Sequence, residues 1–84
     1  TAGDGSIRAP GQAVAFAERA ARLTARREAR TLDVLAVAYA AADRFDEAVT
    51  TAREAQALAD PVLAEEIALH LAMFERRQAW VDKR

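Results

Sequence analysis

Apolar residues recur at helical spacing through the middle of the chain, with large side chains on one segment and small ones on the next. They are Leu32, Leu35 and Tyr39 on the first segment, and Ala48, Ala52 and Ala55 on the second. Residues three and four apart share one face of a helix. Small side chains let two helices approach closely. The pattern therefore predicts a pair of packed helices joined by a turn at 42–44, with Tyr39 filling the space beside the alanines.

The same periodicity and its punctuation predict four helices, at about 10–24, 28–42, 45–59 and 61–79, after a loop or disordered terminus at 1–9. Pro10 suits the first turn of a helix, where its missing N–H costs nothing. Asp43 tolerates the left-handed conformation that ends many helices. Asp60 and Pro61 form an N-cap followed by proline at the first helical position. Residues 80–84 are expected to form a short tail.

Composition agrees with an all-α domain spanning 10–84. The three glycines lie at positions 3, 5 and 11, and 23 of the 84 residues are alanine, the best helix former. Alanine contributes little buried area, and a chain of this length buries only a little over roughly 60% of its unfolded surface. The margin of stability is expected to be thin.

Charge and cysteine usage narrow the classes of partner. The net charge is −1, there is no cysteine, and no apolar run approaches the ~18 residues of a membrane span. We therefore expect neither a nucleic-acid nor a membrane partner, and no disulfide or thiolate metal site. A cytoplasmic location fits, with the periplasm as an open alternative.

An internal repeat links residues 11–23 to residues 46–58. A shift of 35 aligns five identical pairs: Ala13 with Ala48, Val14 with Val49, Ala17 with Ala52, Ala20 with Ala55, and Leu23 with Leu58. These positions are expected to face inward. A repeat at this spacing predicts helical hairpins that stack into an array.

The pattern resembles the tetratricopeptide repeat (TPR) family, and most closely the C-terminal repeats of a bacterial TPR protein. The signature positions are Leu32, Leu35, Ala36 and Tyr39 in the first helix, and Phe45, Ala48, Ala52 and Ala55 in the second. Leu32 stands where the family usually has Trp, and Ala52 where it has a large aromatic. The resemblance implies antiparallel hairpins in a right-handed superhelical solenoid fragment, with one full repeat and a half repeat on each side. It also implies a protein-protein interaction scaffold.

In TPR folds the first helix of each hairpin lines a concave groove. Mapped here, the groove residues would be Arg30, Asp33, Val34, Val37, Ala40 and Ala41. They form a small apolar floor with one charge pair at its rim, which suits a peptide or the apolar face of a helix. The alternative, equally favoured, is that these residues pack against another helix of an array or another copy of the chain.

A second apolar stripe lies along the last helix. It consists of Val62, Leu69, Met73 and Trp80. The helix is then apolar over more than half its circumference, whereas a terminal helix should present a broad polar face to water. Either Trp80 and Val81 fold back over the stripe, or another chain covers it. We favour self-association, as a homo-oligomer, or contact with a partner.

Residues suited to catalysis or metal binding are few. His70 falls inside the apolar stripe of its helix, and no Asp, Glu or Cys at ligand spacing shares that arc, so a core or edge histidine is expected. The acidic pairs at 46–47 and 65–66 open helices, where the helix dipole favours them. The arginines between 19 and 30 are expected to be a solvated junction. We therefore expect no enzyme activity, cofactor, metal or small-molecule substrate.

Two alternatives to a binding scaffold remain open. The first is a non-binding structural C-terminal cap of a longer TPR array attached to a catalytic domain such as a glycosyltransferase. The second is an unrelated four-helix bundle that shares the small-residue spacing. Helix crossing geometry separates the bundle from the repeat, because antiparallel hairpins stacked with a superhelical turn favour TPR and a closed bundle does not.

Overall fold

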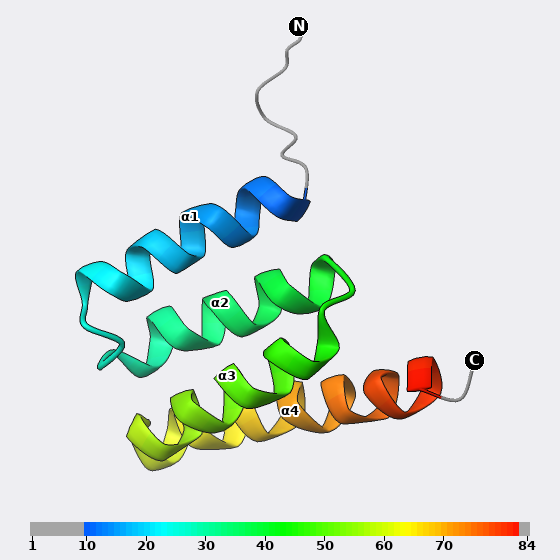
Figure 1. Cartoon of the computed structure of the whole chain (residues 1–84). Coiled ribbons are helices and arrows are strands. Elements are labelled where there is room, and N and C mark those ends of the chain that lie inside the picture. The colour runs from blue at the N-terminus through cyan, green and yellow to red at the C-terminus, as the bar shows by residue number, and fades with distance from the viewer. Residues whose placement is uncertain (1–9, 83–84) are drawn as a thin grey trace, which may run out of the picture.

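The computed structural model describes residues 10–82, which form four helices (Figure 1): α1 (Pro10–Leu23), α2 (Ala29–Ala41), α3 (Phe45–Leu58) and α4 (Pro61–Asp82). Each helix starts within one residue of its predicted position. The predicted loop at 1–9 lies outside the described residues. The expected tail from Trp80 is wrong, because α4 continues to Asp82. No glycine or proline follows Pro61, so nothing in the sequence breaks the helix there. Trp80 is part of α4 and cannot fold back over its stripe.

The helices alternate in direction, so that α1 and α3 run one way and α2 and α4 the other (Figure 1). Helix α2 packs against α1, α3 and α4, whereas within residues 10–82 α1 packs against α2 alone. The described part measures 41 × 36 × 19 Å. Its thickness corresponds to about two helix diameters. The fold is all-α with the layered packing of a helical repeat fragment, and α1 and α4 do not meet as a closed bundle requires.

The core lies mainly between α2 and its neighbours. Leu32, Leu35 and Ile67 are the largest fully buried side chains. The alanines of α3 predicted to pack there are fully buried, and Tyr39 is only 7% exposed, as its predicted packing role requires. Burying large side chains against alanines brings α2 and α3 close together, and this contact is the most extensive among the four described helices.

The turns after α1 and α2 have the same hydrogen-bonding pattern, a Schellman motif without glycine. After α1, Ala25 N–H donates to Arg22 O at 3.0 Å and Arg26 N–H to Ala21 O at 2.8 Å. Ala25 and Arg26 both have φ 56°. After α2, Asp43 has φ 61°, in the left-handed conformation predicted for it.

Asp60 caps α4 as predicted. Its Oδ1 accepts a hydrogen bond from Leu63 N–H at 2.8 Å, and its carbonyl accepts one from Ala64 N–H. Pro61 takes the first helical position. This sequence signal fixes where the longest helix begins.

The prediction that all five repeated pairs face inward is wrong in part. Val14, Val49, Ala17 and Ala52 are buried. On α1, however, Ala20 is exposed and Leu23 is 81% exposed, and Leu58 at the end of α3 is 50% exposed. The prediction of burial is wrong at the positions that no other described helix covers. Burial depends on the neighbouring helix as well as on the residue.

Candidate functional site

An open apolar groove runs between α1 and α2, with a volume of about 520 Å³. We call it the α1–α2 groove. Its first wall consists of Ala13, Phe16, Ala17 and Ala20 from α1. Its second wall consists of Val34, Val37, Ala38 and Ala41 from α2. Every lining residue is apolar and most are small, so the groove is shallow and offers contact area rather than hydrogen bonds.

A second groove of about 360 Å³ lies between α2 and α4. Helix α2 contributes Val37, Ala40 and Ala41 to its lining, and the turn after α2 contributes Asp43. The rest comes from Phe45 of α3 and from Met73, Phe74 and Arg77 of α4. Val37 and Ala41 line both grooves. The two grooves are therefore parts of one surface, which we call the groove face.

Four of the six groove residues predicted from sequence lie on this face: Val34, Val37, Ala40 and Ala41. The other two do not. Arg30 is exposed at the start of α2, and Asp33 is 7% exposed. The Asp33 carboxylate Oδ1 lies 2.9 Å from His70 Nδ1 on α4. The predicted charge pair at the rim is thus replaced by a contact between helices.

His70 is half-buried at the edge of the core, as predicted. Its ring stacks on Phe74 with centroids 6.2 Å apart. The sequence did not indicate Asp33 as its partner, because a helical wheel places residues of one helix only. Within residues 10–82 no group of three or more His, Cys, Asp or Glu side chains could hold a metal ion.

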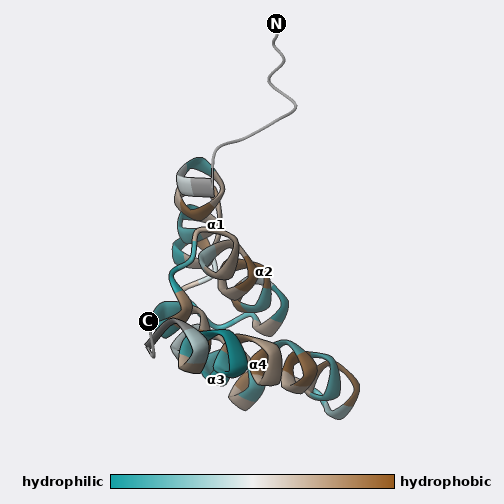
Figure 2. Cartoon of the chain, turned by 90° about the vertical axis from the view of Figure 1, so that its right-hand side faces the viewer, coloured by the Kyte–Doolittle hydropathy of each residue, from teal (hydrophilic) through white to brown (hydrophobic). Residues whose placement is uncertain are grey.

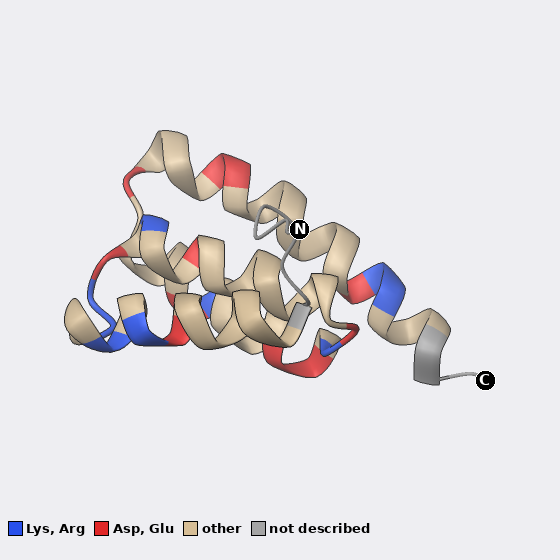
Figure 3. Ribbon diagram, turned by 90° about the horizontal axis from the view of Figure 1, so that it is seen from above, with Lys and Arg blue, Asp and Glu red and all other residues tan. Residues whose placement is uncertain are grey.

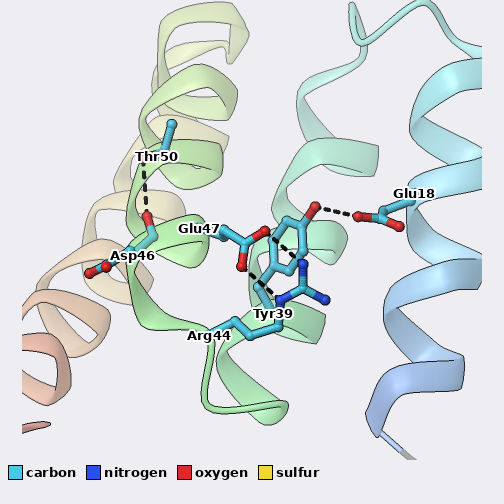
Figure 4. A network of polar contacts seen from close by, with 6 residues as sticks. All are labelled: Glu18, Tyr39, Arg44, Asp46, Glu47 and Thr50. Carbon is cyan, nitrogen blue, oxygen red and sulfur yellow. Dashed lines mark hydrogen bonds and ion pairs between the residues drawn. The ribbon is translucent and has the colours of Figure 1, made fainter.

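Tyr39 of α2 contacts α1 through its hydroxyl and the turn before α3 through its ring (Figure 4). The hydroxyl donates a hydrogen bond of 2.6 Å to Glu18 Oε2 on α1. Burial, and then this bond to a carboxylate, raises the pKa of Tyr39 to about 12. On the other side, the Arg44 guanidinium lies 4.8 Å from the ring centroid. Arg44 also donates two bonds of 2.7 Å to the Glu47 carboxylate, and they lower the pKa of Glu47.

Arg44 and Tyr39 occupy the two positions of the Schellman motif that usually make an apolar contact. Here that contact is a cation–π interaction. Within the basic stretch after α1, Arg26 bonds Glu54 of α3 at 2.7 Å, which raises the pKa of Arg26. Its partner therefore lies on another helix rather than within the junction.

The predicted stripe on α4 is exposed. Val62 is 77% exposed, Leu69 73%, Met73 54% and Trp80 56%. We call these residues the α4 stripe. In Figure 2, the brown of hydrophobic residues is visible along α4 and α2. Met73 also lines the α2–α4 groove, so the stripe borders the groove face.

Among the described residues, no helix is both long and apolar enough to span a membrane.

Comparison with protein families, with curated proteins and with solved structures returns no match. The TPR resemblance is therefore carried by the residues of this chain alone. Sequence reasoning also missed the wall that α1 contributes to the groove. The repeat could have indicated it, since the α1 residues there are the equivalents of α3 residues that are buried.

Proposed function

We propose that the chain is a protein-protein interaction scaffold of the TPR type, whose groove face binds an amphipathic helix. The observation that carries this proposal is the continuous, largely apolar groove face across α1, α2 and α4. Its walls combine alanines with exposed Val34 and Val37, which are 55% and 44% exposed. Apolar grooves of this kind bind helices through side chains at i, i+3, i+4 and i+7.

The packing of α2 on α3 supports a helix as the ligand. On α3, which packs against α2 more extensively than against α4, Ala48, Thr51, Ala52 and Ala55 are each at most 4% exposed. In the internal repeat, the positions 35 residues earlier are Ala13, Phe16, Ala17 and Ala20, which form the α1 wall of the groove. The groove thus repeats, in open form, a surface that a helix covers elsewhere in the molecule.

Charges around the groove indicate how such a helix would lie. Arg19 adjoins the α1 wall, and Arg30 stands one turn before Val34 on α2. Both mark the end where α1 finishes and α2 begins, and basic residues gather at that turn on the left of Figure 3. Acidic residues in the first turn of an incoming helix would meet these arginines and favour its own dipole.

The test is a titration with a fluorescent synthetic helical peptide. The peptide carries leucines at i, i+3, i+4 and i+7 and glutamates in its first turn. We expect a saturable rise in fluorescence anisotropy. Ala20→Trp fills the groove and should weaken binding at least ~10-fold, or about 1.4 kcal/mol. The matched control is Ala57→Trp, an exposed alanine of α3 outside both grooves.

A peptide of the same composition, scrambled to remove its apolar face, serves as the second control. If Ala20→Trp and Ala57→Trp bind the probe equally, the α1–α2 groove is not the binding site. If the intact chain binds no amphipathic probe, the scaffold proposal is wrong. That result would favour the structural cap of a longer array, in which the exposed α1 wall would serve as packing surface for another repeat.

A further inference from the structure

We propose, building on the helix-binding function above, that the groove face binds α4 of a second copy of this chain. The two copies would form a closed dimer with a two-fold axis. Each copy places its α4 stripe in the α1–α2 groove of the other. The helix that the groove binds would then be α4 of another copy of the same chain.

The distribution of exposed apolar side chains is the first support. Within residues 10–82, nine large hydrophobic residues are exposed. Three of them, Phe16, Val34 and Val37, line the groove, and four form the α4 stripe. Only Leu23 and Leu58 lie elsewhere. Exposed apolar area is thus concentrated in two patches, as expected of interaction surfaces.

The two patches are complementary in size. The groove walls are rich in alanine, which leaves a shallow trough. The α4 stripe presents large side chains, among them Leu69, Met73 and Trp80. The core likewise combines large side chains of α2, such as Leu32 and Leu35, with buried alanines of α3 in one cluster. Met and Trp are enriched at protein-protein contacts.

The charges are complementary as well. Glu65 and Glu66 lie between Val62 and Leu69, near the start of α4. The groove has Arg19 and Arg30 at one end. Bringing the acidic turn to the basic end makes the incoming α4 parallel to α2 and antiparallel to α1. This is the relation that α2 has to α4 and α3 within one copy (Figure 1).

The α4 stripe and the α1–α2 groove lie on the same side of the molecule. Met73 of the stripe lines the α2–α4 groove, and that groove shares Val37 and Ala41 with the α1–α2 groove. A two-fold axis parallel to the helices leaves the direction of every helix unchanged, so the second copy's α4 stays parallel to the first copy's α2. The same axis reverses the order of the helices across the groove face. Each stripe then covers the partner's groove, and the assembly closes at two copies. Stable dimers bury roughly 800 Å² per partner, about one seventh of the 5575 Å² surface.

The experiment is sedimentation equilibrium of the whole chain over a concentration series. Two variants break one patch each: Leu69→Asp in the stripe and Val34→Asp in the groove. Both positions are more than half exposed, so the fold should tolerate them. The control is Leu58→Asp, an exposed leucine outside both patches. We expect the parent chain and control to form dimers, and each patch variant to raise the dissociation constant at least ~10-fold.

Mixing the two patch variants gives the sharper result. A mixed pair keeps one intact contact, between the stripe of Val34→Asp and the groove of Leu69→Asp. Reciprocal pairing therefore predicts that the mixture associates more strongly than either variant alone. Circular dichroism of each variant confirms that it is folded before it is compared.

Three outcomes would overturn the dimer. They are a strict monomer at every concentration, assemblies that grow beyond two copies, and a mixture that associates no better than its components. None of these outcomes decides the groove's ability to bind a helix, which the peptide titration measures separately. Conversely, displacement of the dimer by the synthetic helix would support both proposals.

Discussion

Helices α1 and α3 share five identical positions yet have different surroundings. Helix α3 packs against both α2 and α4, whereas α1 packs against α2 alone within the described residues. Val14 and Val49 are both buried, but Ala55 is fully buried while its equivalent Ala20 is exposed. The difference teaches that each repeated helix carries two contact surfaces. The fold uses both surfaces of α3 and leaves one surface of α1 open as a groove wall.

The largest expected effect comes from removing the residue that joins the two regions. Tyr39 is 7% exposed, bonds Glu18 of α1 and packs in the core with the α3 alanines. Tyr39→Ala should lower the free energy of unfolding by about 3–5 kcal/mol, measured by urea denaturation. A loss below about 1 kcal/mol would contradict the packing described for α2.

Enlarging equivalent alanines tests the comparison directly. Ala55→Leu forces extra volume into a fully buried position and should cost about 1–3 kcal/mol. Ala20→Leu adds the same volume at an exposed position and should change stability by less than about 0.5 kcal/mol. Equal costs would show that α1 is as tightly covered as α3.

The stability at alkaline pH tests the hydrogen bond between Tyr39 and Glu18 of α1. The pKa of Tyr39 is about 12 in the folded chain and roughly 10 when unfolded. The unfolded state therefore loses the proton first, and the stability that Tyr39 contributes falls as pH rises from 10 to 12. The loss should reach about 2 kcal/mol by pH 12. Tyr39→Phe should remove this component, so an unchanged pH profile in that variant would exclude Tyr39 as its source.

The turns at the ends of α1 and α2 provide the smallest effect. Ala25 holds a left-handed φ of 56° without the polar side chain that helps Asp43. Ala25→Gly should raise the free energy of unfolding by up to about 1 kcal/mol, and Asp43→Gly by less. Thermal melting of both variants compares them, and a larger gain at Asp43 would refute the strain assigned to Ala25.

Much of the fold could be predicted from local signals. Pro10, Asp43 and the Asp60–Pro61 pair marked helix ends that depend only on the chemistry of neighbouring residues. The buried faces of α2 and α3 followed from periodicity.

What could not be predicted involves contacts between helices far apart in sequence. The pattern placed Asp33 on the groove, but His70 lies 37 residues later and binds it across the α2–α4 contact. The α1 wall was missed for a related reason. The prediction gave identical residues of a repeat identical surroundings, whereas no helix of the described part of the chain covers Ala20 or Leu23.

The stacking of helices in sequence order has a consequence for how the chain folds. Within residues 10–82 most packing joins consecutive helices, and the one contact that skips a helix, α2 with α4, is the smallest. Such a protein has low contact order, so little loop entropy is lost before contacts form, and folding within microseconds to milliseconds is expected. Helix α1, held from one side only, should open before the rest, and its amides should exchange with deuterium faster than those of α3.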